Sequence, residues 1–146
     1  MSKTIDNAKR TINGTYGEVW CDGEKIAECT ACQAKVAINK ETVNLCGQFM
    51  SDAKATSANG TGSLELYKVD SGFARKQDGI QDGMDRRFTI VSKLKDPDSY
   101  GAERVALYNV SFDDLTLADW KAATVGTVTK AFTFSRYQYL DEIEVQ

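Results

Sequence analysis

The sequence contains no histidine. Without an imidazole, the chain cannot build a Ser-His-Asp or Cys-His nucleophile, an imidazole metal site or the usual general base of neutral pH. It has one proline, no apolar run long enough to span a membrane, and no opening segment of the signal-peptide type. We therefore expect a protein made and kept in a cytoplasm, with no membrane binding as a monomer, no cofactor and no enzymatic activity.

The sequence also lacks an excess of either charge. It carries 18 basic and 21 acidic residues, for a formal net charge of -3. Basic residues are scattered, and the densest pair is Arg86-Arg87. A nucleic-acid-binding surface or a polybasic membrane anchor requires a basic cluster, so neither is predicted.

Candidate metal and cofactor motifs fail on their context. Cys29-Thr-Ala-Cys32 has the spacing of a redox or zinc pair, but it lies in a predicted strand, where residues three apart face opposite sides. The D-x-D-x-x-G run from Asp96 to Gly101 has tyrosine and leucine where a calcium loop needs ligands. Gly60-Thr61-Gly62 lacks the third glycine and the following helix of a dinucleotide site. We expect no metal site and free cysteine thiols.

A short acidic cluster is the remaining catalytic candidate. Asp113, Asp114 and Asp119 could serve acid-base chemistry, or they could be turn formers and solvated edge charges. We favour the second interpretation. Leu115, Leu117 and Trp120, which lie among these residues, are expected to return to the core.

The 146 residues predict one mainly β domain with a polar N-terminal arm over residues 1–14 and one helix over about 71–83, begun by Ser71 and ended by Gly83. Asp22-Gly23 between two short apolar runs predicts a type I′ hairpin. Clean alternation predicts a strand over residues 29–39, and a phase change between residues 103 and 112 predicts a bulge.

A long loop over residues 44–60 is the most unusual predicted element. Connections usually take about 4–6 residues, so a loop of this length indicates disorder or docking onto a partner. Apolar anchors within it favour docking. The residues that we expect to contact a partner are Leu45, Phe49, Met50, Ser51, Asp52, Lys54, Thr56, Asn59 and Gly60.

One face of the last strand-rich segment carries threonine and serine, at Thr127, Thr129, Thr133 and Ser135. Such a face must meet water or a polar neighbour rather than a core. The residues alone therefore favour a self-associating structural protein or a binding module over an enzyme, and they leave that choice open.

Three stretches resemble the tail-tube proteins of contractile-tailed bacteriophages (myoviruses), defective prophages and phage-tail-like bacteriocins. They are Gly17-Glu18-Val19-Trp20 with Asp22-Gly23-Glu24; Thr56 to Gly62 running into Leu66-Tyr67-Lys68-Val69; and Gly101 to Val105 with Leu107 to Asp113, closed by Phe132-Thr133-Phe134. Their order and spacing cover nearly the whole chain. Near the end of the chain, Arg136 and two tyrosines stand where the resemblance implies an acidic-rich ending.

The resemblance implies a β-sandwich or barrel-like subunit that forms stacked hexameric rings, and so a hollow tail tube for DNA ejection or envelope puncture. It implies the sheath, tape-measure, baseplate and terminator proteins as partners, with DNA as transient cargo, and a place in the virion tail. A tube subunit of a non-contractile tail or of a type VI-like secretion system is the alternative within this class. A small-ligand-binding β-barrel is the alternative from another class.

Overall fold

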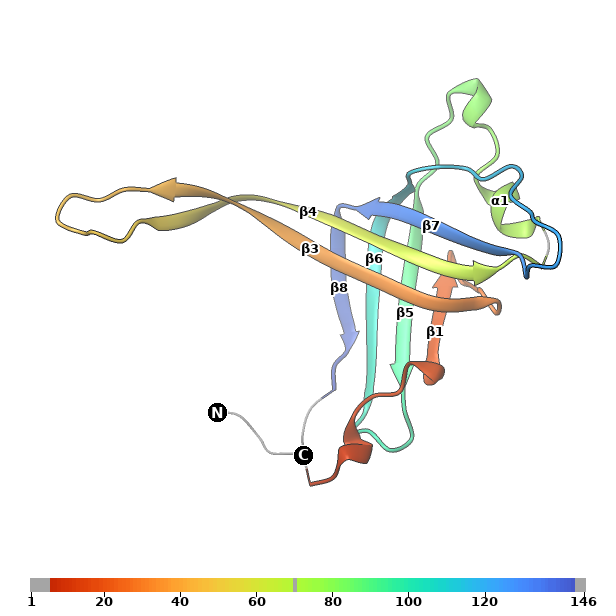
Figure 1. Cartoon of the computed structure of the whole chain (residues 1–146), viewed down its shortest axis with the longest axis horizontal. Helices are drawn as coiled ribbons and strands as arrows, with labels where there is room; N and C mark the ends of the chain where they lie inside the picture. Colours follow the sequence, from red (N-terminus) through yellow and green to blue (C-terminus); the bar gives the residue numbers. More distant parts are fainter. Residues whose placement is uncertain (1–5, 70, 144–146) are drawn as a thin grey trace.

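The fold is a bent antiparallel sheet from which one long hairpin projects (Figure 1). The computed structural model describes residues 6–69 and 71–143, apart from the side chain of Phe73. The strands are β1 (Gly17–Cys21), β2 (Glu24–Lys25), β3 (Cys29–Val43), β4 (Asp52–Tyr67), β5 (Phe88–Lys95), β6 (Ala102–Phe112), β7 (Thr127–Phe134) and β8 (Arg136–Asp141). The helical segments are η1 (Ala8–Arg10), η2 (Gly14–Tyr16), α1 (Gly72–Lys76) and η3 (Ile80–Asp82).

The strand order is β2-β1-β5-β6-β7-β4-β3, with β8 added to β6. Strand β6 belongs to both halves of the sheet, because it pairs with β5 and β8 while its end pairs with β7. The two halves bury one apolar cluster: Val19, Cys21, Ile26, Leu64, Leu66, Phe88, Ile90, Leu107, Val110, Phe132 and Phe134. The predicted mainly β, sandwich-like class is confirmed.

Two predicted backbone features are present. Asp22 and Gly23 both have positive φ, 51° and 85°, between the paired Cys21 and Glu24, as a type I′ turn requires. In β6, Asn109 has φ 59°, and the register against β5 shifts between Phe88 and Ile90. This bulge bends β6 at the point where it passes from one half of the sheet to the other.

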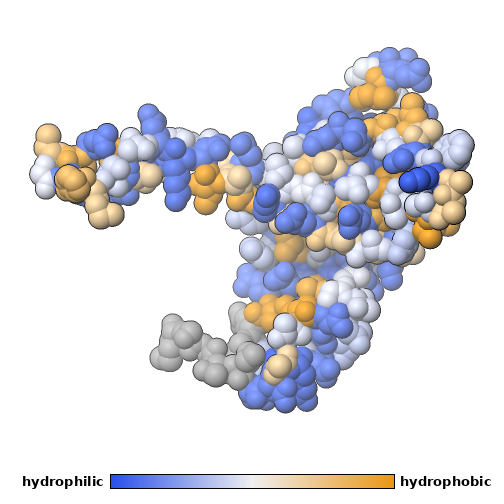
Figure 2. All heavy atoms as spheres, in the orientation of Figure 1, coloured by the Kyte–Doolittle hydropathy of each residue, from blue (hydrophilic) through white to orange (hydrophobic). Residues whose placement is uncertain are grey.

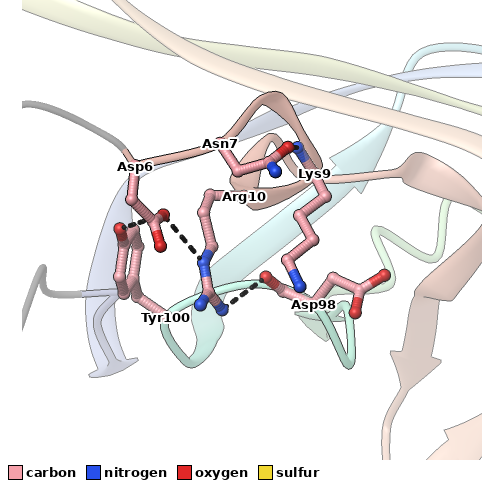
Figure 3. Close-up of polar contacts among 6 residues, drawn as sticks. All are labelled: Asp6, Asn7, Lys9, Arg10, Asp98 and Tyr100. Carbon is pink, nitrogen blue, oxygen red and sulfur yellow. Dashed lines mark hydrogen bonds and ion pairs between the residues drawn. The ribbon is translucent and has the colours of Figure 1, made fainter.

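The N-terminal segment, as far as it is described, docks on the turn between β5 and β6 (Figure 3). The Asp6 carboxylate accepts hydrogen bonds from Arg10 Nε at 3.2 Å and from Tyr100 Oη at 3.1 Å. Arg10 Nη1 also donates to the Asp98 carbonyl, and the guanidinium lies 5.0 Å from the Tyr100 ring centre. Residues 1–5 of the predicted N-terminal arm lie outside the described residues.

Three predictions about elements are wrong. The helix is only five residues long, because Gly79 adopts φ 106° and breaks it before η3; Ser71 is its N-cap residue but makes no capping hydrogen bond. Residues 52–60 form strand instead of loop. Leu117 and Trp120 are exposed, because the segment after β6 runs outside the core; Leu115 is half-buried.

Candidate assembly surface

The most prominent surface feature is the distal part of the β3–β4 hairpin, residues 37–59, which we call the arm (Figure 1). The ladder between β3 and β4 runs from Cys29↔Leu66 to Val43↔Asp52. Strand β7 covers β4 only as far as Gly60, which pairs with Phe134. Beyond that rung, no further strand of the described residues pairs with the hairpin, and every arm residue is exposed.

The free end of the arm carries apolar side chains (Figure 2). Residues 44–51, which we call the tip, contain no charged residue and turn at Gly47, with φ 83°. Phe49 is 106% exposed, Met50 77% and Leu45 53%. An apolar cluster at the end of a projecting hairpin is typical of an interaction site.

The predicted contact residues fall into two groups. Leu45, Phe49, Met50 and Ser51 lie together in the tip. Asp52, Lys54, Thr56, Asn59 and Gly60 lie along β4, where Thr56 Oγ1 donates to the Asn39 carbonyl and Asp52 Oδ1 accepts from the Ala53 amide. The structure thus places all nine residues on the β3–β4 hairpin, four of them in the tip and five on strand β4.

The β3 strand of the arm was not included in the predicted assembly surface. Residues 44–60 were predicted to be a loop, so the distal part of β3 had no predicted partner strand. Lys40 to Val43 pair with residues 52–55, and Ile38 pairs with Ala58. One feature of the sequence could have predicted the hairpin. Gly47 lies midway between two segments of similar length, as the turn of a hairpin does.

The sheet made by β3, β4 and β7 has two unlike faces. The face toward the core carries the aromatic and aliphatic side chains, including Leu64, Phe132 and Phe134. The opposite face carries mostly small polar side chains, set by the register as far out as the Asn39–Ser57 pair: Ala31, Gln33, Lys35, Ala37, Asn39, Ser57, Asn59, Thr61, Ser63, Glu65, Tyr67, Thr127, Thr129, Ala131 and Thr133. As far out as the Asn39–Ser57 pair, Lys35 and Glu65 are the charged residues of this face. The structure therefore supplies the water-facing surface that the threonine and serine pattern predicted.

Two open grooves flank the root of β3. One, of about 590 Å³, lies where the arm leaves the body, between β3 and the strands β5, β6 and β8; we call it the root groove. Leu94, Val105, Tyr137 and Tyr139 are among its lining residues. The other, of about 640 Å³, lies between β3 and β1, β2 and β5. Both grooves open because β3 is the last strand of its sheet and overhangs the other half.

Chemistry-bearing groups are sparse over the part of the chain that the structure describes. Within residues 6–69 and 71–143, no three cysteine or acidic side chains lie close enough together to hold a metal ion. Burial raises the pKa of the Cys21 thiol to about 11, which leaves it protonated at neutral pH. No helix among these residues is long and apolar enough to cross a membrane.

Comparisons with known proteins agree with one another. A family model described as phage tail tube protein matches residues 5–141. "Phage-like element PBSX protein XkdM" of Bacillus subtilis is 42% identical over 113 residues, which cover 76% of this chain and 77% of the relative. A solved structure of a Bacillus subtilis protein is 36% identical, covers 92% of this chain and 99% of its own, and has a TM-score of 0.53.

A more distant structure shares the fold. It comes from the sheath-tube complex of an extracellular contractile injection system, PVC, in the extended state. It is 12% identical, with a TM-score of 0.72, and the match covers 91% of this chain and 95% of the other.

Proposed function

The chain belongs to the phage tail tube protein family, and from this premise we propose that its copies form hexameric rings that stack into a hollow tube through the arm. As a member of this family, the protein is a structural subunit of the virion tail. The resemblance drawn from its sequence is confirmed.

The proposal rests on the projecting, fully exposed arm and its apolar tip. A two-stranded hairpin with no third strand is marginally stable in water, and this one also exposes Phe49 and Met50 at its end. Both costs fall if the arm lies against another copy. Because the arm of one subunit meets a different surface on the next, the contact is heterologous, and a heterologous contact that does not close into a ring generates an open filament.

Ring closure would use the free strand edges. Strand β3 ends its sheet, and no strand within residues 6–69 and 71–143 pairs with its outer side. Long exposed edges invite pairing with another chain, and a closed barrel of strands from neighbouring subunits removes them. The β3–β4–β7 sheet would then turn its polar face toward the lumen.

A lumen of this composition suits a conduit. Hydroxyl and amide groups remain hydrated, and Lys35 and Glu65 offset each other, so the wall offers no net positive charge to bind phosphate. DNA would pass as transient cargo. The protein would act mechanically and without turnover, inside a sheath, with a tape-measure protein setting the length and baseplate and terminator proteins at the ends.

Negative-stain electron microscopy of the concentrated protein, with its mass from light scattering, tests the proposal. We expect rings or tubes of uniform diameter. A variant in which Asn-Gly replaces residues 40–56, between the paired Asn39 and Ser57, should remain folded but form no tubes. Normal tubes from this variant would show that the arm is not the stacking element.

A further inference from the structure

The root groove is an open cleft lined mainly by apolar side chains, with Lys35 and Glu103 also among its lining residues. Its walls come from β3 on one side and from β5, β6 and β8 on the other, and it measures about 590 Å³. On the β3 side the lining residues include the small Cys32 and Ala34 beside Val36, and Ala34 pairs with Gly62. The two halves of the sheet therefore do not meet side chain to side chain at this edge.

The floor and far wall of the groove suit an apolar guest. Leu94 and Val105 line it, and Tyr137 and Tyr139 stand on β8 as an edge-to-face pair with ring centres 6.1 Å apart. Each tyrosine is 54% exposed. Tyrosine is enriched where one side of a ring is packed by a partner and its hydroxyl stays in water.

The tip is a surface of the same chain that matches this groove. Residues 44–51 have no charge to desolvate, and Phe49 and Met50 are among the most exposed apolar side chains of the molecule. Phenylalanine and methionine both gain from contact with aromatic rings. An apolar groove and an apolar projection on the same chain are the two unlike patches that head-to-tail assembly requires.

The tip cannot fill the groove of its own subunit. The strands beyond Val36 continue away from the body, and the seven residues to Val43 carry the chain roughly 23 Å at about 3.3 Å per residue. Figure 1 shows the tip at the far end of the arm, remote from β8. A tip in a root groove therefore belongs to a different copy.

We propose that the tip of one subunit docks in the root groove of a neighbouring subunit, with Phe49 and Met50 against Tyr137 and Tyr139. This inference rests on the proposed tube function and names the surface that receives the arm. The contact couples successive copies, because each subunit offers its tip to one neighbour and its groove to another.

Cross-linking between two tagged copies tests the contact. The exposed or half-buried cysteines are first replaced, by Cys29→Ser, Cys32→Ala and Cys46→Ser; buried Cys21 stays. One copy then carries Gln48→Cys beside the tip anchors, and the other carries Glu103→Cys on the groove lining. A short bis-maleimide is added after concentration, and the same sample is viewed by electron microscopy.

Tubes together with a covalent heterodimer support both proposals. Tubes without the heterodimer overturn the docking site and leave the tube intact. A heterodimer without tubes supports docking and counts against the tube, and the loss of both counts against both. We expect Phe49→Asp in the tip copy to lower the yield at least tenfold.

Two controls keep the test specific. Asp119→Cys, on the exposed segment after β6, replaces Glu103→Cys as acceptor; an equal yield there would overturn the assignment, since it would indicate random collision. Trp120→Asp removes an equally exposed aromatic residue outside the tip and should change the Gln48–Glu103 yield less than twofold. A tenfold loss there would equally contradict a tip-specific contact.

Discussion

Gly62 on β4 lies directly opposite Phe132 on β7, and the phenyl ring of Phe132 occupies the space where a side chain of residue 62 would begin. A Cβ at Gly62 would lie 2.5 Å from Phe132 Cζ and would also collide with the Gln33 carbonyl. Gly60 has the same relationship to Phe134. Glycine at these positions lets the two aromatic rings lie flat across β4. The rings cover the glycine backbone, which has no side chain of its own to pack and would otherwise weaken the strand.

Gly62→Ala should therefore destabilise the fold by about 1–3 kcal/mol, because the added methyl group forces the Phe132 ring and the β3 backbone apart. Urea unfolding of the full chain, at a concentration where it is monomeric, measures this. Gly101→Ala is the matched control, since a Cβ there meets no atom within 4 Å. A Gly62→Ala variant as stable as Gly101→Ala would contradict the packing argument.

The two glycines illustrate what the sequence could and could not predict. In the sequence, Gly60-Thr61-Gly62 could only be compared with a nucleotide fingerprint and then placed at the end of the predicted loop. Its packing role depends on Phe132 and Phe134, about seventy positions further along the chain. Local patterns such as Asp22-Gly23, by contrast, contain the whole cause of their geometry and were predicted correctly.

The same distinction applies to the candidate assembly surface. Its apolar anchors, Phe49 and Met50, were evident because they interrupt a polar stretch. The strand over residues 52–60 was missed because one of its faces carries only alanine and glycine apart from the bulge, so no large apolar side chain marks the alternation. The root groove was missed because strands from four separate parts of the chain form it.

The turn between β1 and β2 is held by Asp22 in two ways. Its backbone has φ 51°, and its Oδ1 accepts a hydrogen bond from the Thr89 amide at 2.8 Å. Asp22→Ala should lose about 1–2 kcal/mol of unfolding free energy, because alanine tolerates this φ poorly and leaves the amide unpaired. Asp22→Asn keeps both properties and should recover most of the loss in the same urea experiment. Equal losses in the two variants would show that the carboxylate charge is what matters.

Docking of the N-terminal segment should depend on acid pH. Hydrogen bonds from Arg10 and Tyr100 hold the pKa of Asp6 below its ordinary 3.8. Because the docked state has the lower pKa, its contribution is fully present above about pH 4 and is lost as the pH falls through the lowered value. Amide exchange and Tyr100 ring shifts, followed by NMR from about pH 5 to about pH 2, should report undocking of residues 8–10.

Asp6→Asn is the control for this titration, since an amide does not ionise in that range. Its N-terminal segment should be less well docked at pH 5 and should show no further change on acidification. A transition that persists in Asp6→Asn would assign the pH dependence to another carboxylate.

Lys130 is a buried basic residue on the core face of β7, and its residue is 2% exposed. Among residues 6–69 and 71–143, its Nζ has no hydrogen-bond partner. Burial lowers the pKa of Lys130 from its ordinary 10.5, and nearby Asp114 offsets this only in part. An unpaired buried ammonium group costs stability, whereas its methylene stem packs like an apolar side chain.

Lys130→Met should therefore raise the unfolding free energy at neutral pH by about 1–2 kcal/mol, because it keeps the stem and removes the charge. Lys130→Ala should lower it, since the stem is lost as well. The sign of the pH dependence follows from the lowered pKa: the folded state disfavours the proton, so the native protein gains stability as the pH rises toward 10.5. The advantage of Lys130→Met should shrink over the same range. A Lys130→Met variant less stable than the native protein would mean that the ammonium group has a partner in the folded subunit. The same stability comparison on assembled tubes would show whether a neighbouring subunit supplies a partner.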